Sequence, residues 1–151
     1  MVLESSARCV LVCEDDPAMV RIFQFLLRQQ GIHTVITAAN GEHVTALAKK
    51  HNPALILLDL MLPVKDGVTV LRELKEDGVT RTIPVIVVSG KESNAQVQEA
   101  MAAGAIDYVI KPFEPMELGV RIKSFLDTLN DTSLGTSVQT PPSSTGLGGP
   151  R

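Results

Sequence analysis

Residues 55–63 read Leu-Ile-Leu-Leu-Asp-Leu-Met-Leu-Pro, an apolar run that ends at an aspartate. Short continuous apolar runs of this kind are typical of parallel strands that are buried on both faces. Five such runs rich in Val, Ile and Leu occur along the chain, at residues 8–13, 34–38, 54–58, 85–89 and 106–110. We therefore predict five central parallel strands.

Between these runs the apolar residues recur three and four positions apart, as on one face of a helix. Five stripes result: Met19, Ile22, Phe23, Leu26 and Leu27; Val44, Leu47 and Ala48; Val70, Leu71 and Leu74; Val97, Ala100 and Met101; and Leu118, Ile122, Phe125, Leu126 and Leu129. Gly31, Gly78 and Gly104 stand where helices would close in a left-handed conformation, and Pro17 stands where one would begin. Alternating strands and helices predict an α/β fold, a three-layer doubly wound parallel sheet, with sites beyond the carboxyl ends of its strands.

Length and composition predict one domain in a chain of 151 residues, 44% of them hydrophobic. A net charge of -3 offers no field that would attract nucleic acid or an anionic membrane, so we expect neither as a partner. No apolar run approaches the ~20 residues that span a bilayer, and we expect a cytoplasmic location. Residues 132–151 are mostly Gly, Pro, Ser and Thr, so we predict a folded domain at 1–131 followed by a flexible tail or linker.

The cysteines and histidines carry no predicted site. Cys9 and Cys13 lie in one predicted strand, ~13 Å apart, which is too far for a disulfide. We interpret them as packed reduced thiols, with a reactive thiol as the alternative. His33, His43 and His51 show no ligand spacing, so we interpret them as surface or structural residues.

Side chains that could bind a metal ion or react with a phosphoryl group lie at one edge of the predicted sheet. Carboxylates from two strand ends supply the oxygen ligands that Mg2+ prefers, and a further carboxylate can attack phosphorus if cations neutralise the transferring group. A lysine provides such a charge and a hydroxyl one more hydrogen bond. These residues are Glu14, Asp15 and Asp16 after the first strand, Asp59 after the third, Ser89 at the end of the fourth and Lys111 after the fifth.

Four sequence blocks, at residues 10–17, 57–67, 84–90 and 104–113, resemble the signature blocks of CheY-like receiver domains of response regulators. The resemblance covers about residues 7–130. It implies a flavodoxin-like sheet with strand order 2-1-3-4-5 and five helices. It also implies that a sensor histidine kinase or a histidine phosphotransfer protein donates a phosphoryl group to Asp59. Such a domain is a phosphoacceptor signalling module, not an enzyme in the usual sense, because it catalyses only its own phosphorylation and autodephosphorylation.

The resemblance also assigns a metal site. It implies Asp15 as the principal metal carboxylate, Glu14 as a contact to the metal or its water, and Asp59 and the backbone carbonyl of Met61 as further ligands. The expected ion is Mg2+, for which Mn2+ could substitute. Glu14 replaces the aspartate more often found there, which we interpret as a change of metal geometry. Asp16 falls at an acidic position that is less essential in the family.

The same resemblance implies a switch formed by Ser89 and Tyr108. A downstream effector would bind the face formed by the fourth helix, the fifth strand and the fifth helix, and phosphorylation could produce a dimer there. The alternative is that Ser89 is an ordinary strand-end hydroxyl and Tyr108 a half-buried ring. The cognate kinase and the output are not specified by the sequence.

Three further features are implied by the family resemblance. The Lys111-Pro112 peptide bond is usually cis there. Met61 and Lys91 would flank the water that attacks the acyl phosphate, although Lys91 could equally be a solvated loop lysine.

Two other readings fit the sequence less well. Phosphatases of the haloacid dehalogenase type carry an Asp-x-Asp-x-Thr motif at this strand, whereas residues 59–63 of this chain read Asp-Leu-Met-Leu-Pro. An inert pseudo-receiver would be expected to lack the acceptor, the lysine or the acidic pair, and all are present. The sequence therefore favours a phosphorylatable receiver.

Overall fold

The computed structural model describes residues 8–133, in two parts whose boundary lies between Pro115 and Met116. Five parallel strands form one sheet in the order β2-β1-β3-β4-β5, which confirms the predicted topology. The strands are β1 Cys9–Cys13, β2 Thr34–Ala38, β3 Leu55–Leu58, β4 Val85–Ser89 and β5 Asp107–Ile110.

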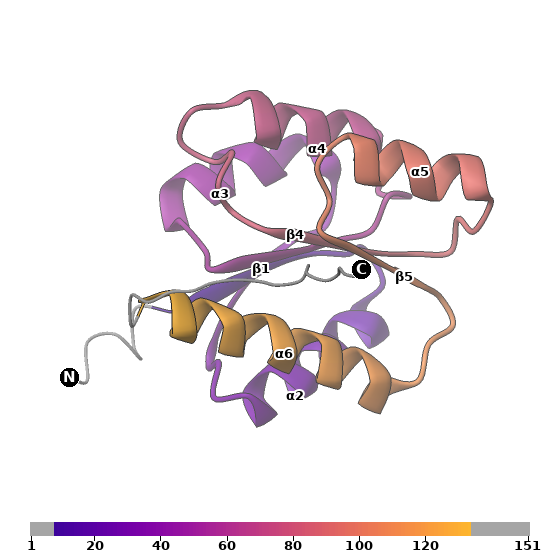
Figure 1. The fold of residues 1–151 in the computed structure, drawn as a ribbon. Coiled ribbons are helices and arrows are strands. Elements are labelled where there is room, and N and C mark those ends of the chain that lie inside the picture. Colours follow the sequence, from indigo (N-terminus) through magenta and orange to yellow (C-terminus); the bar gives the residue numbers. More distant parts are fainter. Residues whose placement is uncertain (1–7, 134–151) are drawn as a thin grey trace, which may run out of the picture. The chain divides into compact units, whose positions relative to one another are not determined.

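Five α-helices and one 3-10 helix alternate with the strands. They are α2 Pro17–Gln29, η1 Gly41–His43, α3 Val44–His51, α4 Gly67–Glu76, α5 Asn94–Ala102 and α6 Pro115–Ser133. Within the first part, α2 lies on one side of the sheet, and α3, α4 and α5 lie on the other (Figure 1). The first part therefore has the three predicted layers. None of the described helices is long and apolar enough to cross a membrane.

Burial is complete only in the three inner strands, β1, β3 and β4. The outer strands β2 and β5 are partly exposed, so the prediction that all five are central and buried is wrong for these two. An outer strand pairs with another strand on one side only. Its apolar sequence does not show whether the strand lies at the edge or in the middle of the sheet. Two residues of the predicted helical stripes, Ile22 and Met101, are also exposed.

Backbone register explains why the strand ends meet. In the parallel pairing Cys13 is level with Leu58, and Leu58 is level with Val87. The residues that follow β1, β3 and β4 therefore emerge side by side at the carboxyl edge of the sheet. Cys9 and Cys13 are buried and free, as predicted.

Helix ends confirm two of the three glycine predictions. Gly31 and Gly104 have φ of 86° and 116°, and each follows a helix closed by hydrogen bonds of the Schellman type. Gly78 does not have a positive φ, and α4 ends at Glu76 with its C-cap Asp77 in extended conformation, so the prediction for Gly78 is wrong. The buried Thr80 hydroxyl donates to the carbonyl of Leu74 (2.7 Å) and satisfies that end of the helix instead.

The predicted domain boundary remains a prediction. Helix α6 extends to Ser133, two residues beyond the expected end of the domain at 131. The rest of the predicted tail, residues 134–151, lies outside the described residues.

Candidate functional site

Three carboxylates meet at the carboxyl edge of the sheet. Glu14 and Asp15 follow β1, and Asp59 follows β3. One carboxylate oxygen from each lies within 4.8 Å of those of the other two, so the group can hold a metal ion. Glu14 and Asp59 are 3% and 6% exposed, whereas Asp15 is exposed. The structure thus brings together the acidic residues that the sequence placed at separate strand ends.

Lys111 lies between two of these carboxylates. Its Nζ is 2.7 Å from Oε1 of Glu14 and 2.9 Å from Oδ2 of Asp59. Its backbone N–H donates to the carbonyl of Ser89 (2.9 Å), which fixes the start of the loop after β5. The peptide bond to Pro112 is cis, as the resemblance implied. The direct pairing of Lys111 with Glu14 was not predicted, because sequence spacing does not show which acid a lysine reaches.

The charges of this group are strongly coupled. Burial raises the pKa of Glu14 above its ordinary value, and the negative charge of Asp59 adds to this, while the hydrogen bond and charge of Lys111 act against it. Burial alone would lower the pKa of Lys111, but its hydrogen bonds to Glu14 and Asp59 and their charges raise that pKa above the ordinary value. Lys111 is therefore positively charged at neutral pH.

Both oxygens of the Asp59 carboxylate are oriented by hydrogen bonds. Oδ2 accepts from Lys111, and Oδ1 accepts from the backbone N–H of Met61 (2.9 Å). The loop holding Met61 is packed tightly against the start of α4, where a Cβ on Gly67 would lie 2.3 Å from Cα of Leu60. Only glycine fits at this close approach.

Ser89 and Tyr108 are joined through the backbone of Lys91. The fully buried Ser89 Oγ accepts from the N–H of Lys91 (3.3 Å), and the Tyr108 hydroxyl donates to the carbonyl of Lys91 (2.6 Å). Burial raises the pKa of Tyr108, so its phenol stays a donor at neutral pH. The sequence predicted the two residues as a pair but not the residue that links them.

Asp16 has a structural place beside the site. Its side chain caps α2 by accepting from the N–H of Ala18 (3.0 Å), and its own N–H donates to Oε2 of Glu14 (3.2 Å). Pro17 is the first residue of α2, as predicted. The histidines lie outside the metal-binding group found among the described residues; His33 and His43 are exposed and His51 is half-buried.

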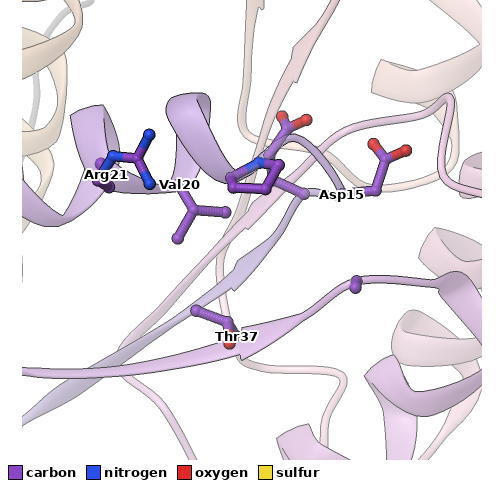
Figure 2. A pocket seen from close by; sticks show the side chains of 7 residues that line it. Asp15, Val20, Arg21 and Thr37 are labelled. Atoms are coloured by element: carbon purple, nitrogen blue, oxygen red, sulfur yellow. The ribbon is translucent and has the colours of Figure 1, made fainter.

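An open cleft of about 300 Å³ begins beside the acidic pair. Figure 2 shows Val20 of α2 and Thr37 of β2 on its two sides, with Asp15 and Arg21 also around it. The full lining is Glu14, Asp15, Pro17, Val20, Arg21, Thr37 and Ala39. Sequence reasoning missed the cleft, because its walls come from a helix and a strand that are adjacent only in space.

Comparison with known proteins identifies the family. The model for the response regulator receiver domain matches residues 10–123, and this chain belongs to that family. The fold is accordingly that of a receiver domain, a signalling domain of two-component systems.

Among curated relatives, the DNA-binding response regulator MtrA of Mycolicibacterium smegmatis is 33% identical over 82% of this chain and 53% of its own length. The alkaline phosphatase synthesis transcriptional regulatory protein PhoP of Bacillus subtilis is 34% identical over 78% of this chain and 48% of its own length. The chain thus spans about half the length of the curated relatives it matches.

Solved structures agree. One is the receiver domain of a sensor histidine kinase from Pseudomonas aeruginosa PAO1, which has a magnesium ion coordinated in its active-site cleft. It matches with a TM-score of 0.71 and 28% identity, and the match covers 80% of this chain and 98% of that one. The Mn2+-bound form of response regulator Rcp1 has a TM-score of 0.67 and 28% identity, covering 90% and 99%.

Proposed function

We propose that Asp59 accepts a phosphoryl group from a sensor histidine kinase or a histidine phosphotransfer protein in a Mg2+-dependent reaction. Phosphorylation then changes the conformation of the domain and controls a downstream partner or output domain. The observation that carries this proposal is the buried Asp59 carboxylate, which is oriented by Lys111 and by the N–H of Met61 beside two further acids.

The chemistry assigned to Asp59 is nucleophilic. A carboxylate oxygen attacks phosphorus, the bond from phosphorus to the donor's histidine nitrogen breaks, and its electron pair leaves with the imidazole. Lys111 contributes its positive charge next to the attacking oxygen, which stabilises the negative charge of the transferring group. Because Lys111 already contacts Asp59, it needs only a small movement to bind the phosphoryl oxygens.

The acidic group fits a magnesium ion, because it offers several oxygen ligands within a small space. Glu14, Asp15, Asp59 and the Met61 carbonyl would hold Mg2+, or Mn2+ in its place. The bound ion would neutralise charge on the transferring phosphoryl group. Metal ions in two related receiver structures support the assignment.

A cytoplasmic location goes with this proposal. Cys9 and Cys13 are both free, which is compatible with a reducing compartment. The downstream partner and any dimer formed on phosphorylation would use the face that receiver domains form from their fourth helix, fifth strand and fifth helix, as the family resemblance implies.

The decisive experiment is intact-mass spectrometry after incubation with acetyl phosphate and Mg2+. The parent should gain one acid-stable, base-labile phosphoryl group, and Asp59→Asn should fold but gain none. Asp15→Ala and addition of EDTA should both abolish the adduct, because the negative charges of Glu14, Asp59 and the donor would otherwise repel. An adduct at the parent's level in Asp59→Asn, or in EDTA, would refute the acceptor or the metal dependence.

A second experiment tests the switch. Ser89→Ala should still accept phosphate, but it loses the hydroxyl that holds the N–H of Lys91. We expect the phosphate-induced NMR shifts around Tyr108 to shrink, because a population shift requires a contact that differs between the two states. Shifts equal to those of the parent would show that Ser89 does not couple to Tyr108.

A further inference from the structure

Lys91 connects three elements beside the Asp59 loop. Its backbone N–H donates to Oγ of Ser89 at the end of β4, and its backbone carbonyl accepts from the hydroxyl of Tyr108 in β5. Its Nζ lies 4.0 Å from Oδ1 of Asp66, the residue that caps α4. The Lys91 side chain is only 30% exposed, so it is mostly covered and is not a freely solvated loop lysine.

The two carboxylate oxygens of Asp66 have different partners. Oδ2 accepts from the backbone N–H of Thr69 (3.2 Å) and is 3.5 Å from its hydroxyl, which is the helix-capping interaction. Oδ1 faces Lys91. Capping needs one neutral acceptor, and asparagine caps a helix about as well as aspartate. The negative charge of Asp66 is therefore not required by the helix and is available to Lys91.

The loop that carries Lys91 passes close to the loop that carries the acceptor. A Cβ built on Gly90 would lie 3.9 Å from Sδ of Met61, and the N–H of Met61 donates to Asp59. Because hydrogen bonds hold both the N–H and the carbonyl of Lys91, its flexible side chain is the part that is free to change partner. A phosphoryl group on Asp59 would present a second anion to it.

We propose that Asp66 is a positioning residue that competes with phosphorylated Asp59 for the ammonium group of Lys91 and thereby shortens the lifetime of the acyl phosphate. This inference rests on the proposed function of Asp59. In hydrolysis a water oxygen attacks phosphorus, the bond from phosphorus to the Asp59 oxygen breaks, and its electron pair returns to the carboxylate as inorganic phosphate leaves. When Lys91 pairs with Asp66 the phosphorus is open to this water; when it pairs with the phosphoryl group it shields the phosphorus.

The test measures the phosphoryl half-life in Mg2+ after acetyl phosphate is removed, in the parent, Asp66→Asn, Lys91→Gln and the double variant. An ion pair with an exposed carboxylate is weak, so we expect Asp66→Asn to lengthen the half-life about two- to fivefold. In the Lys91→Gln background the same substitution should have no effect. Asp77→Asn, which removes a negative charge at the other end of α4, is the matched control and should decay like the parent.

Two results would overturn the inference: decay of Asp66→Asn at the parent's rate or faster, or an equal lengthening in the Lys91→Gln background. A parent that gains no adduct would instead refute the proposed function and, with it, this inference. Asp66→Ser, which also keeps a capping side chain, serves as a second variant if Asp66→Asn folds poorly. The affinity for beryllofluoride, a phosphoryl mimic, gives an equilibrium measurement and should rise about two- to fivefold in either variant.

Discussion

Lys111→Met should destabilise the metal-free domain more than any exposed lysine substitution. The ammonium of Lys111 is 2.7 Å from Glu14 and 2.9 Å from Asp59. At an effective dielectric of 20, each contact corresponds to about 6 kcal/mol of Coulomb attraction, most of which offsets the cost of burying the charges. Removing the lysine leaves two buried carboxylates without a cation, and such a loss typically costs about 3–5 kcal/mol.

The assay is urea unfolding in EDTA, with Lys49→Met as the control. Lys49 forms an equally short pair with Asp77 (2.7 Å), but its side chain is 48% exposed, so its loss should cost much less than the loss of Lys111. Saturating Mg2+ should restore part of the stability of Lys111→Met, because the ion replaces the missing positive charge.

The pH dependence of this variant has a definite sign. Burial already raises the pKa of Glu14, and the loss of Lys111 removes the interactions that lower it. A carboxyl whose pKa is raised in the folded state stabilises folding below its unfolded pKa, and this stability is lost as pH rises through the folded pKa. The difference in free energy of unfolding between Lys111→Met and the parent should therefore become smaller below about pH 5. The reasoning would be refuted if Lys111→Met and Lys49→Met lowered the free energy of unfolding equally. It would also be refuted if the difference between Lys111→Met and the parent did not depend on pH.

Three further predictions concern residues around the site. Val64 is exposed and has φ of 76°, so Val64→Gly should relieve backbone strain and raise the free energy of unfolding by up to about 1 kcal/mol. Val79→Gly, at an exposed position without positive φ, should lower the free energy of unfolding. Urea unfolding compares the two variants, and equal effects would contradict the strain at Val64. Lys91→Ala and Met61→Ala should shorten the phosphoryl half-life, and unchanged decay in both would remove these residues from the path of the attacking water. Val20→Phe, which adds bulk but no charge beside Glu14 and Asp15, tests whether the cleft receives a protein donor: it should slow transfer from a histidine phosphodonor protein and leave the rate with acetyl phosphate unchanged, and equal slowing with both donors would refute this.

The sequence predicted those features that depend on local pattern. Asp59 and Lys111 could be placed because an apolar run marks each strand and the carboxyl ends of parallel strands share one edge. The helix closures at Gly31 and Gly104 were also predictable, since a left-handed residue favours glycine wherever it occurs.

What could not be predicted depends on contacts between distant residues. Gly78 resembles a helix-closing glycine, but the side chain of Thr80 satisfies that end of α4. The exposure of Ile22 depends on which neighbours reach it, not on its place in a helical stripe. The ion pair between Asp66 and Lys91 could not be predicted for the same reason, because the two residues belong to different loops.

The two buried thiols determine how this domain can be labelled. Cys9 and Cys13 are the only cysteines of the chain, they are 6% and 1% exposed, and burial raises the pKa of both. Since the thiolate is the reactive form, the native chain should react slowly with maleimides and similar reagents. One cysteine introduced at an exposed position, for example Glu92→Cys in the loop after β4, should therefore take a fluorophore or spin label selectively. A conformational change could then be followed in real time without first replacing the native cysteines.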